Sequence, residues 1–192
     1  MTRRAGDIYD ELLIMRCQDG DSKALETLTT RWHTRLLRYA HRHLGDHDAA
    51  HDVVQEGWLA IVRGIHKLDD PAMFKAWAYR ILSNKCADWL RARVRHRRQR
   101  TKMENHAPSQ PNETNRTPAD DSENSDESTR LRRAMDQLTN EQRALLHLRY
   151  VEEMSVPMIA DVFAIAEGTV KSRLHHLRET LRQQLAGHNE NN

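Results

Sequence analysis

The stretch with the clearest chemical potential is residues 155–178, SVPMIADVFAIAEGTVKSRLHHLR. If a helix begins at Glu167, its outer face carries mainly hydroxyl, imidazole and cationic groups. The face consists of Glu167, Thr169, Lys171, Ser172, Arg173, His175, His176 and Arg178. Hydroxyls and cations near a helix start are suited to contacts with phosphates and base edges of DNA. The alternative is a plain helical hairpin whose charged face is merely solvated.

Two short helices and a tight turn would position these side chains. Ser155 is placed to cap a helix that ends at Phe163, the turn runs from Ala164 to Ala166, and Glu167 opens the second helix. The shared core would comprise Ile159, Ile165, Val170 and Leu174. This is a helix-turn-helix pattern, in which the second helix lies in the major groove.

Composition predicts an all-α protein of two small helical domains. Gly and Pro are few, at 7 and 5 of 192 residues, and helix-forming residues are common. Residues 106–128 contain almost nothing apolar, so they cannot bury enough surface to offset the entropy of ordering. We therefore predict a first domain over 1–97, a flexible acidic linker over 98–127 and a second domain over 128–192.

Apolar periodicity and capping residues predict the helices of each block. The first block is expected to have helices at about 7–18, 21–44, 48–66 and from Pro71 onward. In the second block, helices are expected at 128–137, from Thr139 to about 152, at 155–163 and from Glu167. Thr139 and Gln142 have the spacing of a capping box. Gly57, inside a helix, indicates close helix approach, and Trp77 and Trp89 are expected in the core.

Charge is segregated along the chain. Seven Lys and Arg residues lie between Arg91 and Lys102, although the formal net charge is only +2. We expect this basic run to extend the fourth helix along DNA phosphates. No apolar stretch is long enough for a signal peptide or a membrane span, so a cytoplasmic protein without membrane insertion is expected.

Twelve histidines raise the question of a metal site. His43, His47 and His51 are spaced by four, as ligands on one helical face would be. However, Gly45 and Asp46 are expected to break the helix between the first two. We therefore predict no metal, no cofactor and no small-molecule substrate.

Three motifs resemble those of one family. The segment GTVKSRL (168–174), preceded by LTNEQRALLHLRYVEEMS, resembles the promoter-recognition domain, region four, of extracytoplasmic-function (ECF) sigma factors of the sigma-70 family. HDVVQEGWL (51–59) resembles the polymerase-binding helix of region two, and FKAWAYRILSNKCADWLRAR (74–93) resembles its helix that reads the minus-ten element. Ala164, Ala166 and Ser83 depart from the family pattern, which usually has Gly, Pro and Arg there.

The resemblance implies a role for each motif. Binding of bacterial core RNA polymerase would fall to Asp52, Gln55, Glu56 and Trp58. Contact with the minus-ten element of promoter DNA would fall to Lys67, Lys75, Tyr79, Arg80, Asn84 and Arg91, with residues 66–70 resembling a base-capturing loop. Contact with the minus-thirty-five element would fall to Glu167, Thr169, Lys171, Ser172, Arg173, His175 and Arg178. It also implies an anti-sigma factor as a regulatory partner.

Two other classes of function compete with a sigma factor. A helix-turn-helix transcriptional regulator that acts without polymerase would explain 155–178, but neither 51–59 nor 74–93. A metal-dependent nuclease could use the His and Asp residues between His43 and Asp52. No nucleophile and base arrangement and no Gly-rich phosphate loop are visible, so we expect no enzyme.

Overall fold

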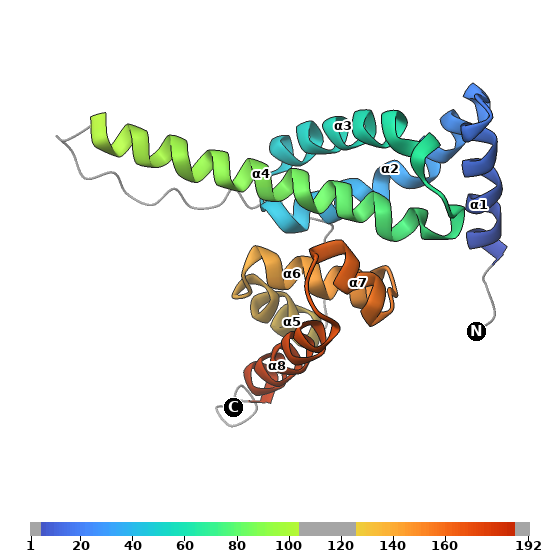
Figure 1. Cartoon of the computed structure of the whole chain (residues 1–192). Coiled ribbons are helices and arrows are strands. Elements are labelled where there is room, and N and C mark those ends of the chain that lie inside the picture. Colours follow the sequence, from blue (N-terminus) through green and yellow to red (C-terminus); the bar gives the residue numbers. More distant parts are fainter. Residues whose placement is uncertain (1–4, 104–125, 187–192) are drawn as a thin grey trace. The chain divides into compact units, whose positions relative to one another are not determined.

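The computed structural model describes residues 5–103 and 126–186, which fall into two compact units, Met1–Pro111 and Asn112–Asn192 (Figure 1). Every regular element in the described ranges is helical, as predicted. None of the helices described is both long and apolar enough to cross a membrane.

The first unit is built from four helices, α1 (Ala5–Gln18), α2 (Ser22–Leu44), α3 (His47–Gly64) and α4 (Phe74–Met103). Helix α2 packs against α1, α3 and α4, and α3 also packs against α4. Two short 3-10 segments, η1 (Ile65–Lys67) and η2 (Pro71–Met73), lead from α3 to α4 and lie against α1 (Figure 1). The predicted starts and ends of these helices are confirmed to within a few residues.

Local capping residues fix both ends of α2. The Asp21 side chain accepts hydrogen bonds from the backbone N–H groups of Lys23 and Ala24, and Gly45 ends the helix in the left-handed conformation with φ of 67°. The bond from Ala24, followed by that from Arg16, lowers the pKa of Asp21. Each cap depends on neighbours within a few residues, so both ends of α2 are set locally.

Aromatic rings form the centre of the first unit. Trp32 meets Phe74 edge-on at a ring-centroid distance of 5.1 Å, and Tyr39 meets Tyr79 at 5.1 Å. The Tyr39 hydroxyl hydrogen-bonds the Ser83 hydroxyl at 2.5 Å inside this core. Position 83 is buried, and the small Ser83 places no charge in this core.

Helix α1 has apolar side chains on two faces. Leu13, Ile14 and Cys17 are buried, whereas Ile8, Leu12 and Met15, which also have helical spacing, are exposed. On the inner side, the Asp10 carboxylate pairs with Arg31 of α2 at 2.8 Å. The helix itself is confirmed, but tertiary packing selected the other apolar face.

Two glycines allow close approach between α3 and α4. A Cβ at Gly57 would lie 3.2 Å from Leu82 Cδ1, which confirms the close helix approach expected from its sequence position. At Gly64 a Cβ would lie only 2.9 Å from Trp77 Cζ2. Trp77 is half-buried rather than fully in the core. Its ring therefore packs directly over the last turn of α3.

Replacing Gly64 with Ala is expected to lower the free energy of unfolding by about 1–3 kcal/mol, because the rigid Trp77 ring has to move. Urea unfolding followed by circular dichroism measures this change. Gly6→Ala is the control, since its nearest neighbour would be Arg31 Nη2 at 3.9 Å, and it is expected to gain up to about 1 kcal/mol. Unchanged stability of Gly64→Ala would contradict the close contact.

The second unit contains α5 (Asp126–Asp136), α6 (Asn140–Leu146), the π-helical segment η3 (His147–Val151), α7 (Val156–Phe163) and α8 (Glu167–Ala186). The capping box of Thr139 and Gln142 and the Ser155 cap are confirmed. The helix predicted from Thr139 to about 152 changes to π geometry at His147. The core of the second unit includes Leu138, Leu145, Leu148, Met154, Ile159, Val162, Val170 and Leu177.

The turn between α7 and α8 forms without the glycine that is usual in the family. Ala164 adopts the left-handed conformation with φ of 52°, and its N–H closes α7 by bonding to Ala160 and Asp161 carbonyls. Ile165 N–H bonds to the Ala160 carbonyl at 3.1 Å. The predicted turn is confirmed, and these bonds offset the strain of an alanine in this region.

The predicted linker boundaries, 98 and 127, require correction. Helix α4 continues through Met103 and α5 begins at Asp126, so residues 98–103 and 126–127 are helical. The cause is the basic run, whose residues are good helix formers and extend α4 beyond its buried part, as expected. The remaining linker residues, 104–125, lie outside the described residues.

Candidate nucleic-acid interface

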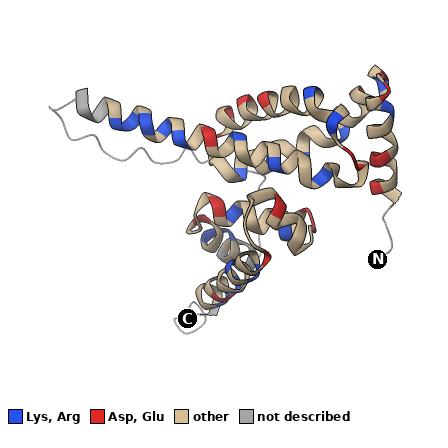
Figure 2. Ribbon diagram, in the orientation of Figure 1, with Lys and Arg blue, Asp and Glu red and all other residues tan. Residues whose placement is uncertain are grey.

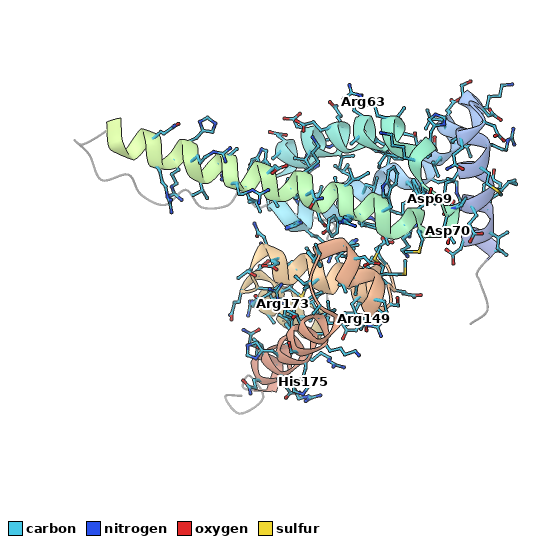
Figure 3. All side chains as sticks on the ribbon, in the orientation of Figure 1. Arg63, Asp69, Asp70, Arg149, Arg173 and His175 are labelled. Atoms are coloured by element: carbon cyan, nitrogen blue, oxygen red, sulfur yellow. The ribbon has the colours of Figure 1, made fainter. Side chains whose placement is uncertain are left out.

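Helices α7 and α8 form the predicted helix-turn-helix, and α8 turns its polar face outward. Val170, Leu174 and Leu177 are buried on the inner face. The outer face exposes Glu167, Lys171, Ser172, Arg173, His175 and Arg178, while Thr169 is half-buried. Figure 3 shows Arg173 and His175 on α8. Every side chain predicted to contact the minus-thirty-five element therefore lies on this helix, and all but Thr169 are exposed.

Several of these polar groups are tied to neighbours in the free protein. Lys171 Nζ lies 3.8 Å from Glu167 Oε2, one turn away, and the Ser172 hydroxyl donates to the Thr169 carbonyl at 3.0 Å. Arg173 pairs with Glu141 of α6. These exposed pairs are weak enough for DNA phosphates or bases to replace them.

Helix α4 presents a second polar surface. Arg80, Asn84 and Arg91 are exposed, and Lys75 is half-buried. Arg91 Nη2 lies 2.5 Å from Asp88 Oδ1, and this hydrogen bond lowers the pKa of Asp88. Further along α4, Arg93, Arg95, Arg97 and Arg98 are also exposed. Figure 2 shows these cations along the part of α4 that extends beyond the other helices of its unit.

Tyr79 was predicted to contact DNA, and the structure shows this prediction to be wrong. Its side chain is 0% exposed and packs against Tyr39 and Trp32. Position 79 shares the inner face of α4 with Leu82, Ser83 and Cys86. Trp89, expected in the core, is instead half-buried, with the Arg93 guanidinium 5.1 Å from its ring centroid.

The connection from α3 to α4 exposes several charged groups. His66, Lys67, Asp69 and Asp70 are all exposed, and Figure 3 shows Asp69 and Asp70 near the start of α4. The Asp70 carboxylate accepts a hydrogen bond from Ala72 N–H at 2.9 Å, which caps η2. Lys67 is exposed on the connection that precedes α4, and its contact with DNA stays a prediction.

The outward face of α3 carries the predicted polymerase contacts except Trp58. Asp52, Gln55 and Glu56 are exposed. Trp58 was predicted here, but it is only 9% exposed because it lies on the inner face with Val54 and Ile61. Its role as a surface contact is therefore wrong in this structure.

Sequence reasoning missed three residues on this face, Leu59, Val62 and Arg63. They continue the helical spacing from Gln55 and Glu56, and they are exposed. That spacing could have identified them. Leu59 is 56% exposed, and Val62, one turn further on, is 40% exposed. An apolar centre with a polar rim is typical of a protein–protein interface. Glu56 also pairs with Lys85 of α4 at 3.0 Å.

The three histidines considered as metal ligands do not converge. His43 is buried and meets the Tyr39 ring edge-on, whereas His47 and His51 contact each other with ring centroids 4.7 Å apart. Gly45 ends α2 between the first two, as expected. Within the described ranges, no three His, Cys, Asp or Glu side chains are grouped so that they could hold a metal ion.

Each of the two units matches a known protein family. Residues 28–96 match the family described as Sigma-70 region 2, and residues 128–181 match Sigma-70, region 4. The chain is 28% identical over 185 residues to the ECF RNA polymerase sigma-E factor of Haemophilus influenzae, covering 94% of this chain and 97% of that protein. It is 30% identical over 166 residues to the ECF RNA polymerase sigma factor SigM of Mycobacterium tuberculosis, covering 86% and 79%.

Solved structures share the fold. The sigma factor RpoE of Bartonella quintana, in a complex with the anti-sigma factor NepR, superposes with a TM-score of 0.64 at 22% identity, covering 85% of this chain and 98% of that one. CnrH, in complex with the cytosolic domain of CnrY, gives a TM-score of 0.62 at 22% identity, covering 93% and 98%.

A helical bundle that matches region 2, followed along the chain by a helix-turn-helix unit that matches region 4, defines a transcription initiation factor. The chain belongs to the ECF RNA polymerase sigma factors of the sigma-70 family.

Proposed function

We propose that the two units of this sigma factor have different roles in transcription initiation. The first unit, about residues 1–97, binds core RNA polymerase and the melted minus-ten strand, and the second, about residues 128–192, reads the minus-thirty-five element. The observation that carries this proposal is α8, whose inner face is buried in the helix-turn-helix while its outer face exposes cations, hydroxyls and an imidazole. Such a face fits the major groove.

The α3 face supports polymerase binding. Asp52, Gln55 and Glu56 form its polar part, and Leu59 and Val62 give it an apolar centre. Burial of exposed Leu and Val side chains favours association with a partner helix, and the surrounding charges select the partner. We therefore assign core binding to this face and remove Trp58 from it.

The α4 face supports contact with the melted strand. Lys75, Arg80, Asn84 and Arg91 lie on it, and Lys67 lies on the connection that precedes it. Cations neutralise phosphates, and amide or carboxylate groups can bind an unpaired base. The exposed Arg residues beyond Arg91 would continue the phosphate contacts along the DNA.

Three further points follow from this function. As a sigma factor the protein directs initiation without changing a covalent bond itself, so we propose no enzymatic activity. It would act where RNA polymerase is, in the cytoplasm. An anti-sigma factor is proposed as its regulator, since the similar RpoE structure is a complex with the anti-sigma factor NepR.

Run-off transcription with purified protein, bacterial core RNA polymerase and a library of upstream regions from its own genome tests the function. Start sites are expected only when the protein is present, with shared minus-ten and minus-thirty-five elements upstream. Binding of the protein alone to duplex DNA, with no initiation, would instead favour a helix-turn-helix regulator that acts without polymerase.

A further inference from the structure

One side chain of α1 holds the turn that leads from α3 toward α4. Gln18 Nε2 donates a hydrogen bond to the Ile65 carbonyl at 2.9 Å and another to the Leu68 carbonyl at 2.8 Å. The amide nitrogen has two hydrogens, so it can make both bonds at once. Gln18 closes α1 and is 47 and 50 residues away from these partners in the sequence. Its amide therefore joins two distant parts of the first unit.

These bonds set the shape of the turn. Leu68 N–H also bonds to the Ile65 carbonyl at 3.2 Å, which closes η1. At Leu68 the backbone becomes extended, and Asp70 then caps η2 through Ala72 N–H. The exposed groups of Lys67 and Asp69 stand on either side of Leu68. Their positions thus depend on a turn whose two carbonyls both point at Gln18.

We propose that Gln18 is a positioning residue for promoter recognition: it holds the turn at residues 65–68 so that Lys67 and Asp69 meet one unpaired base and its phosphate. Gln18 is half-buried and acts through the turn. A carboxylate such as that of Asp69 can accept hydrogen bonds from a base amino group, and Lys67 can neutralise a phosphate. This inference rests on the proposed function of the first unit.

A second contact of α1 serves as a control for a merely stabilising effect of Gln18. The Asp10–Arg31 ion pair also attaches α1, but to α2 and away from the turn. Removing Arg31 is expected to loosen α1 without changing the carbonyls of residues 65 and 68. Removing the Gln18 amide is expected to change the turn itself.

The experiment uses reconstituted holoenzyme and a promoter library with a randomised minus-ten element, and it measures base preference at each position from the transcripts. Gln18→Leu removes both donors, and Gln18→Glu replaces them with a carboxylate that can only accept. Each variant is expected to reduce the preference at one position by about tenfold, as expected for lost hydrogen bonds, and to leave the other positions unchanged. Arg31→Met is expected to lower the melting temperature but keep the preference profile.

A uniform loss of transcription at all positions, or an unchanged profile in Gln18→Leu, would overturn the positioning role. Lys67→Ala and Asp69→Ala test whether the turn itself reads a base. They therefore distinguish a failure of the Gln18 role from a failure of the proposed function. If these two variants change the profile while the Gln18 variants do not, only the role of Gln18 is lost. If they too leave it unchanged, the turn does not read a base and the proposed function of this turn fails as well.

Discussion

Replacing Arg173 with Ala is expected to reduce initiation from promoters with an intact minus-thirty-five element by about tenfold to a hundredfold. Arg173 is exposed on the outer face of α8, and a guanidinium can contact a guanine in the major groove through two hydrogen bonds. Loss of these contacts leaves the base edge without a partner. Transcription by the holoenzyme, compared between the intact element and single-base variants, measures the effect. The Arg173→Ala variant should also lose its discrimination between bases at one position of the minus-thirty-five element.

Two control variants make this test specific. Arg182→Ala removes a similarly exposed arginine of α8, which pairs with Glu179, and it is expected to leave initiation nearly unchanged. Glu141→Gln removes the negative charge that pairs with Arg173 in the free protein. If Arg173 contacts DNA, Glu141→Gln should retain activity. If Arg173 instead acts by fastening α8 to α6, both variants should lose activity to the same extent, and the DNA contact would be withdrawn.

Replacing Leu59 with Arg is expected to raise the dissociation constant for core RNA polymerase by at least about tenfold. Leu59 lies at the apolar centre of the outward face of α3, between Gln55 and Val62. A buried charge without a partner opposes association, whereas an exposed leucine in the free protein contributes little to folding. Titration of fluorescently labelled protein with core polymerase, followed by anisotropy, gives the dissociation constants.

Leu131→Arg is the matched control, since Leu131 is similarly exposed but lies on α5 of the second unit. It is expected to keep the affinity for core polymerase. Trp58→Ala should behave differently from both, because Trp58 is buried: it should lower the melting temperature. Equal affinities for Leu59→Arg and Leu131→Arg would show that this face of α3 is not the docking surface.

The features that the sequence predicted correctly depend on residues that lie close together along the chain. Asp21 caps α2 through Lys23 and Ala24, and Thr139 and Gln142 cap each other across three residues. The outer face of α8 follows directly from a period of 3.6 residues. The π-helical geometry of η3 was not predictable in the same way, because the sequence there has an ordinary helical pattern.

The contacts that the family resemblance implied were predicted less well where a residue type fits both the surface and the core. The side chains of Tyr79 and Trp58 are amphipathic, so both residue types are found in binding sites as well as in cores. In the structure both turn inward, Tyr79 toward the rings of Tyr39 and Trp32. Leu59 turns outward instead. The choice depends on which neighbouring helix each face meets.

The sequence by itself determined the helical class, the capped helices, the helix-turn-helix and its polar face, because these depend on local spacing and on motifs. Only the tertiary structure decided which apolar face of α1 is buried, that Ser83 bonds Tyr39, and that Gln18 holds the turn after α3. The last two contacts join residues more than 40 positions apart. Their free energy depends on how several helices pack at once, and no pattern within one helix specifies that arrangement.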